Sequence, residues 1–102
     1  MAGGIDLKHT DWASRTTEIG YWLGPWARGR GVMREAVTQL ASWALQEQRF
    51  DRVELRVATG NIPSRRVAEA SGFVREGVLR NAGYVHAGRV DLIVYSLVPG
   101  DL

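Results

Sequence analysis

The sequence predicts an α+β fold in which helices pack on a mixed β-sheet. A run with helical apolar spacing lies between two runs with strand alternation, an order typical of a β-α-β unit with parallel strands. The carboxyl-terminal part alternates again around a tight turn, which predicts antiparallel strands. A chain of 102 residues is long enough for one core, so we expect a single domain over residues 1–102.

The first half of the chain is expected to hold two strands and one long helix. Gly4–Lys8 is a short apolar run, and a polar loop separates it from Thr17–Leu23, in which every second residue is apolar. Pro25 stops this second strand, because proline has no backbone donor for a ladder. From Val32 an apolar stripe with helical spacing predicts a helix that ends near Gln48.

The second half is expected to continue with a strand, a short helix and a β-hairpin. Arg52–Ala58 returns to a period of two and completes the β-α-β unit. Pro63 suits the first turn of a helix, and Gly72 supplies a left-handed stop. The remaining predicted strands, with a turn at residues 87–89, are Phe73–Leu79, Gly83–His86 and Val90–Leu97.

The composition indicates an ordinary globular protein and excludes several kinds of site. The apolar share is 45% and cysteine is absent, so disulfides, cysteine zinc sites and thiolate nucleophiles are excluded. His9 and His86 lie far apart in sequence, which argues against a metal site. Without a signal-peptide layout or a membrane-length apolar window, we expect a cytoplasmic protein with no membrane partner. The net charge of +2 is too small to predict a nucleic-acid ligand.

The run "ARGRGVMREAV" at residues 27–37 places two arginines and two glycines at a strand-to-helix junction. The first backbone N–H groups of a helix have no intrahelical partner, and the helix dipole is positive there. Gly29 and Gly31 remove the Cβ atoms that would keep a phosphate away, and Arg28 and Arg30 add charged donors. The run predicts an anion site, with a turn edged by solvated arginines as the alternative.

Together with "EIGYWL" before it and "NIPSRRVAEASGF" after it, this loop resembles the GNAT superfamily of acyl-CoA-dependent N-acyltransferases. Within that family the chain is most similar to the RimJ/RimL-like branch, which acetylates ribosomal-protein amino termini. The family's pyrophosphate loop maps onto Arg28, Gly31 and Met33, where methionine replaces the usual glycine or alanine. The resemblance covers nearly all of the chain, whereas roughly the first third of such a domain, a strand and two helices, has no counterpart.

The resemblance implies a GNAT-like fold that binds acetyl-CoA as co-substrate, with no metal. Two parallel strands, ending at Leu23 and Ala58, would splay apart so that the pantetheine amides pair with strand backbone, and Gly20 could carry a bulge. An Asn-x-x-Ser helix start would line the pantetheine arm. The implied cofactor-binding residues are Trp22, Leu23, Arg28, Gly29, Arg30, Gly31, Val32, Met33, Asn61 and Ser64.

Acyl transfer to an amine needs a base, a donor for the thioester oxyanion and an acid for the leaving thiolate. The resemblance implies Glu18 as the base, and a solvent-facing strand glutamate is the alternative. The oxyanion donor would be a backbone N–H near Trp22 or Leu23. Ser64 would donate to the sulfur, with capping of its own helix as the alternative.

Two positions depart from the family pattern. Ala68 stands where many GNAT enzymes have a tyrosine acid, and Gly83 stands where this branch has a glutamate. Tyr84 and Tyr95 could donate instead, although buried tyrosines more often serve packing. The departures favour an alternative function, that of a non-catalytic acyl-CoA-binding module or a subunit completed by a partner chain.

Two further expectations concern partners. A basic nucleic-acid module is a third hypothesis, weakened because no aromatic stacking pattern accompanies its arginines, Arg28, Arg30, Arg34, Arg65 and Arg66. Four tryptophans are many for this length and predict an exposed patch that is buried in a homo-oligomer. They are Trp12, Trp22, Trp26 and Trp43.

Overall fold

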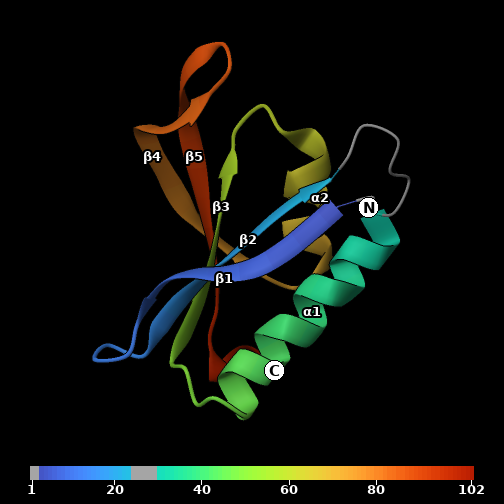
Figure 1. Ribbon diagram of the computed structural model, residues 1–102, viewed down its shortest axis with the longest axis vertical. Helices are drawn as coiled ribbons and strands as arrows, with labels where there is room; N and C mark the ends of the chain where they lie inside the picture. The colour runs from blue at the N-terminus through green and yellow to red at the C-terminus, as the bar shows by residue number, and fades with distance from the viewer. Residues whose placement is uncertain (1–2, 24–29) are drawn as a thin grey trace.

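The computed structural model describes residues 3–23 and 30–102, whose five strands form one mixed sheet with the order β1-β2-β3-β5-β4 (Figure 1). The elements in chain order are β1 (Gly3–Asp11), β2 (Thr16–Leu23), α1 (Arg30–Gln46), β3 (Arg52–Ala58), α2 (Ile62–Ala70), β4 (Val74–Val85), β5 (Gly88–Leu97) and a short 3₁₀ turn (Pro99–Asp101). β2 and β3, which α1 connects, pair in parallel. β4 and β5 form an antiparallel hairpin. The predicted α+β class is confirmed.

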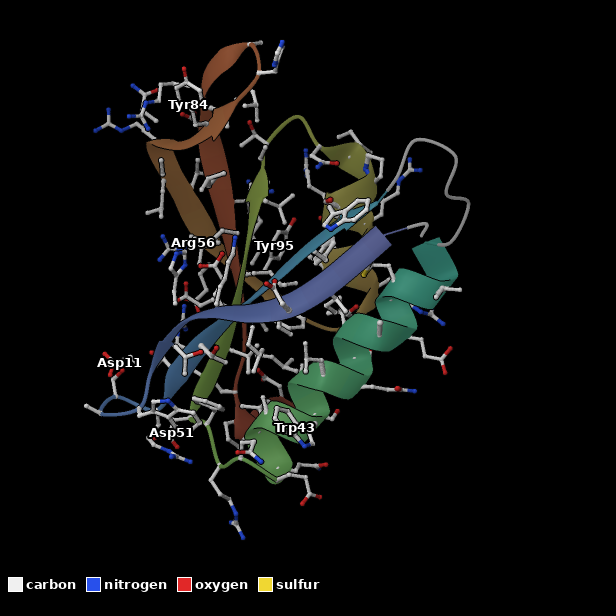
Figure 2. The ribbon with its side chains drawn as sticks, viewed as in Figure 1. Asp11, Trp43, Asp51, Arg56, Tyr84 and Tyr95 are labelled. Carbon is white, nitrogen blue, oxygen red and sulfur yellow. The ribbon has the colours of Figure 1, made fainter. Side chains whose placement is uncertain are left out.

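Both helices lie on one side of the sheet (Figure 1) and share one core with it. The predicted stripe of α1 packs there, with Val37 and Ala41 completely buried against Val53 and Leu55 of β3. Side chains alternate along β3, so Glu54 and Arg56 point to the face opposite Val53 and Leu55. Arg56 and Tyr95 therefore lie on different sides of the sheet (Figure 2). Neither described helix covers the face that carries Arg56, and neither is long and apolar enough to cross a membrane.

The first hairpin is longer than the sequence predicted. β1 continues through the polar residues to Asp11, and β2 begins at Thr16, so only a tight turn remains of the expected loop. The Thr10 and Thr17 hydroxyls lie 2.9 Å apart across the two strands and extend the pairing. The ladder is irregular between Lys8 and Asp11, where its register shifts.

The carboxyl-terminal hairpin also differs in detail. The two strands predicted before the turn form one strand, β4, with register shifts between Arg75 and Gly77 and between Leu79 and Gly83. These bulges absorb the residues that the sequence suggested were a break. Gly72 has a φ of 83°, which confirms the predicted left-handed stop after α2.

Candidate active site

The parallel strands β2 and β3 separate after a short paired stretch, which opens a slot between them. Their register runs from Thr16 opposite Arg52 to Glu18 opposite Glu54, and no pair beyond these is formed in the described ladder. Further along, each strand presents unpaired backbone N–H and C=O groups to the slot, as an added strand would require. The predicted splay is confirmed, whereas Gly20 keeps regular register with β1 and forms no bulge there.

The slot is a cavity of about 110 Å³ at the start of α2. It is lined from β1, β2, β3 and α2 by Lys8, Ile19, Gly20, Tyr21, Arg56, Val57, Ala58, Asn61 and Ser64. Two of the sequence-predicted residues, Asn61 and Ser64, therefore meet the splayed strands at one place.

The start of α2 explains the positions of Asn61 and Ser64. Asn61 is the N-cap, because its side-chain oxygen accepts a hydrogen bond of 3.2 Å from the Ser64 N–H, and Pro63 follows in the first turn. The capping alternative for Ser64 is therefore wrong, and its half-buried hydroxyl faces the slot without a hydrogen bond to the described residues. Tyr21 donates to the Ser64 carbonyl at 2.7 Å, and burial raises the pKa of Tyr21 to about 12.

Glu18 lies on the face of the sheet opposite the helices, at the point where β2 and β3 separate. Its carboxylate contacts His9 Nδ1 at 3.0 Å, Lys8 Nζ at 3.7 Å and Arg56 Nε at 3.9 Å. The residue is only 7% exposed, so the alternative of a solvent-facing strand glutamate is wrong. Three side-chain nitrogens, from β1 and β3, therefore surround this buried carboxylate.

A second cavity, of about 350 Å³, opens over Glu18. It is lined by His9, Thr16, Thr17, Glu18, Glu54 and Arg56. Arg56 lines this cavity and the slot, so the two are neighbours. The Glu54 carboxylate accepts hydrogen bonds from Arg56 Nε at 3.2 Å and from Arg52 Nε at 2.8 Å. The first of these bonds holds Arg56 between the two cavities.

Part of the predicted anion loop lies outside the described residues, namely Arg28 and Gly29. Arg30 begins α1, and a Cβ added at the exposed Gly31 would meet nothing within 4 Å. Val32 is 73% exposed, whereas the Met33 side chain is buried in the core. Met33 could therefore contribute only its backbone N–H, and not its side chain, to an anion site at this helix start.

The other predicted cofactor-binding residues, Trp22 and Leu23, lie at the end of β2. Trp22 is 54% exposed, and its indole lies over Gly4, where an added Cβ would come within 2.6 Å of Nε1. Leu23 is the last residue of β2 and pairs with Gly3. Beyond Glu18, the backbone of this strand has no described partner on the β3 side.

Comparison with known proteins decides the family. Residues 1–74, more than half of the chain, match the family model described as an acetyltransferase (GNAT) domain. The chain belongs to the GNAT family. This confirms the resemblance drawn from the two sequence blocks.

Individual relatives agree with this assignment. The chain is 38% identical over 98 residues to the "Putative ribosomal N-acetyltransferase YdaF" of Bacillus subtilis (strain 168), covering 96% of this chain and 54% of that protein. A crystal structure of a "Probable acetyltransferase" superposes with a TM-score of 0.93 at 36% identity, over 100% of this chain and 57% of that one. The acetyltransferase MccE, solved with acetyl-CoA and AMP, gives a TM-score of 0.84 at 30% identity, over 96% and 54% of the chains. The chain thus spans about half the length of these relatives.

The positions that depart from the GNAT pattern have structural roles. Ala68 is completely buried in the core, and a Cβ at Gly83 would lie 2.6 Å from Leu92 Cδ2. The Tyr95 hydroxyl donates to Glu69 at 3.0 Å, and Tyr84 is 77% exposed in the β4–β5 hairpin. These two tyrosines therefore serve packing and the surface.

Sequence reasoning missed several residues near the GNAT site. Arg34 and Arg66, considered only as part of a basic surface, line a cavity of about 260 Å³ between α1 and α2, together with Gly31. His9, considered only as a metal ligand, contacts Glu18. The described residues contain no cluster of three or more His, Cys, Asp or Glu that could hold a metal. The sequence signal for Arg34 was its spacing, because it follows Arg30 of the Gly-rich loop by four residues.

Proposed function

We propose that this GNAT chain transfers an acetyl group from acetyl-CoA to a primary amine, on a protein amino terminus or a small molecule, by direct attack. The observation that carries the proposal is the slot between β2 and β3, with a helix start near one end and the Glu18 cavity beside it. The related MccE structure contains acetyl-CoA, which supports the choice of donor.

The donor would lie in the slot with its pantetheine amides paired to free strand backbone. Asn61 and Ser64 would line that arm, since both face the slot. The pyrophosphate would meet the start of α1, where Arg28, Gly29 and Arg30 add donors and room, and where Gly31 is open. Val32 and the Met33 backbone would complete the helix start.

The acceptor would approach through the cavity over Glu18, whose carboxylate drives removal of the ammonium proton. A backbone N–H near Trp22 or Leu23 would stabilise the oxyanion of the tetrahedral intermediate. The Ser64 hydroxyl would donate a proton to the departing thiolate, because it lines the slot and does not cap its helix.

A second candidate is an acyl-CoA-binding chain without turnover, or a subunit whose site a partner completes. The favouring observation is the sheet face over Glu18, which neither described helix covers. Both candidates use the same donor slot, and they differ only in whether an acceptor is processed.

Thermal unfolding with acetyl-CoA tests the donor site. Binding to the native state alone should add about 2.7 kcal/mol of stability when the ligand is about 100 times its Kd. Gly31→Asp should abolish this stabilisation, because it places a carboxylate at the proposed pyrophosphate site. Gly100→Asp is the matched control, since Gly100 is equally exposed with open space around it.

No stabilisation at millimolar acetyl-CoA would exclude both candidates. Stabilisation with release of CoA thiol upon adding a peptide amine or a polyamine would support the enzyme. Stabilisation without thiol release would leave the binding chain.

A further inference from the structure

His9 is the most exposed of the side chains that contact Glu18, and it lines the acceptor cavity. The Glu18 side chain is 9% exposed, whereas that of His9 is 74% exposed, and both line the cavity of about 350 Å³. Glu18 Oε1 lies 3.0 Å from His9 Nδ1 and 3.9 Å from Arg56, and Oε2 lies 3.7 Å from Lys8. The carboxylate thus has partners on both oxygens, and the imidazole is the far more exposed of the two groups at the cavity.

His9 reaches this position through the irregularity in β1. Lys8 pairs with Glu18 and points to the same face, so in a regular strand the next side chain would point to the helices. Instead His9 has a φ of 51°, and the register shifts between Lys8 and Asp11. Two consecutive side chains therefore contact one carboxylate, which is the re-aiming that a bulge produces beside a site.

Neighbouring contacts hold the irregularity in place. The Thr17 hydroxyl is buried, lies 2.9 Å from the Thr10 hydroxyl and donates to the Lys8 carbonyl at 3.4 Å. A left-handed conformation is uncommon at a residue other than glycine, and such residues cluster at functional sites. Here it brings the His9 ring within 3.0 Å of Glu18.

From this geometry we propose that His9 accepts the proton of the acceptor ammonium and that Glu18 acts through it as a positioning residue. The inference rests on the proposed acetyl transfer. The carboxylate favours the tautomer with hydrogen on Nδ1, which leaves the lone pair of Nε2 directed away from Glu18. A base oriented by a neighbouring group is a recurring arrangement in sites that use general-base catalysis.

The charged groups around His9 come from three strands. Lys8 belongs to β1, Glu18 to β2, and Glu54 and Arg56 to β3. Glu18 is shared among His9, Lys8 and Arg56, and the His9 contact of 3.0 Å is the shortest of the three. An imidazolium formed during the reaction is therefore stabilised at Nδ1 by this carboxylate.

In the proposed reaction, Nε2 of His9 takes one proton from R–NH₃⁺. The freed lone pair forms the C–N bond to the thioester carbonyl, whose π electrons move to oxygen. An electron pair on the oxyanion then re-forms the C=O bond as the C–S bond breaks, and the C–S electron pair leaves with sulfur, which takes up a proton from Ser64. The second proton on nitrogen replaces that of Ser64, and His9 releases the first to solvent.

The test compares His9→Asn with His86→Asn in the full chain. Asparagine tolerates the left-handed backbone, so the bulge should be kept, and His86, the chain's other histidine, is exposed near the β4–β5 turn. We expect His9→Asn to lower kcat/KM about 100-fold or more and to remove the ascending limb of its pH profile. His86→Asn should leave both unchanged, and acetyl-CoA should stabilise both variants equally. Unchanged kcat/KM and pH profile in His9→Asn would overturn the proposal.

A readout independent of turnover separates this proposal from the proposed function. Nitrogen-15 NMR of the neutral His9 ring should show hydrogen on Nδ1, and Glu18→Ala should shift the population toward hydrogen on Nε2. Hydrogen on Nε2 in the unchanged chain, or no effect of Glu18→Ala, would overturn the dyad even if acetyl transfer is observed. The expected tautomer in a chain that binds acetyl-CoA without turnover would support the dyad and contradict the proposed enzyme.

Discussion

Tyr21 connects the strand that carries Glu18 with the helix that carries Ser64. Its half-buried ring lines the slot, and its hydroxyl donates to the Ser64 carbonyl at 2.7 Å. This bond joins β2 to α2 beside the slot. The alternation in β2 predicted that Tyr21 lies on the core face, but it gave no indication of a polar partner for its hydroxyl.

The ionisation of Tyr21 should destabilise the protein at high pH. Burial raises its pKa from 10.0 to about 12, so the native state disfavours the phenolate. The resulting stability is fully present below pH 10 and is lost as the pH rises to about 12. Thermal midpoints measured across this range should fall more steeply for the wild type than for Tyr21→Phe.

Equal pH slopes for the two proteins would contradict this assignment. At neutral pH, Tyr21→Phe should itself be less stable by about 1 kcal/mol, because the Ser64 carbonyl loses its donor.

At the scale of elements, the Asn61 cap fixes where α2 begins. Asn61→Ala should lower the free energy of unfolding by about 1 kcal/mol, because the Ser64 N–H loses its acceptor. For a chain of this size the thermal midpoint should fall by about 4–8 °C. Asn61→Asp is the control that keeps an acceptor at the cap, and an equal loss in both variants would show that capping is not the cause.

The sequence was sufficient for the order and pairing of most elements. The stripe from Met33 to Ala44 and the alternation of β3 are local patterns, and both correspond to buried faces. The continuity of β4 and the extension of β1 depend on partners across the sheet, so local composition misplaced their ends. A bulge interrupts regular pairing, and whether the strand continues past it depends on the neighbouring strand.

The candidate site was predictable in part for the same reason. Asn61, Ser64 and Glu18 could be named as candidates because each belongs to a pattern that can be recognised along the chain. The contact of His9 with Glu18 depends on a positive φ and a register shift, neither of which the residue type specifies. The burial of Glu18 likewise results from side chains of β1 and β3.

At the scale of the molecule, the sheet separates two chemical environments. On one side, α1 and α2 cover an apolar core; on the other, Glu18, Glu54 and Arg56 form a charged surface. The slot lies where β2 and β3 part, and Arg56 links it to the charged side. In the proposed reaction, the donor would use the slot and the acceptor would use the charged side, so the two substrates need not share an entrance.

The surface of the molecule bears on the predicted self-association. The described tryptophans are all exposed and lie on separate elements, with Trp12 at 59%, Trp22 at 54% and Trp43 at 44%. Trp12 stacks on Phe50 with ring centroids 4.9 Å apart, so part of its surface is already used. Trp22 shares the strand face of Glu18, which neither described helix covers, and is therefore the strongest candidate for an interface.

We expect the chain to self-associate through the face that carries Trp22. Sedimentation velocity should show a weight-average coefficient that rises with concentration, because association removes the exposed indole from water. Trp22→Gln should weaken the association, whereas Trp43→Gln, at an exposed position of α1, should leave it unchanged. A clean monomer at high concentration would contradict the predicted oligomer, and equal weakening by both substitutions would place the interface elsewhere.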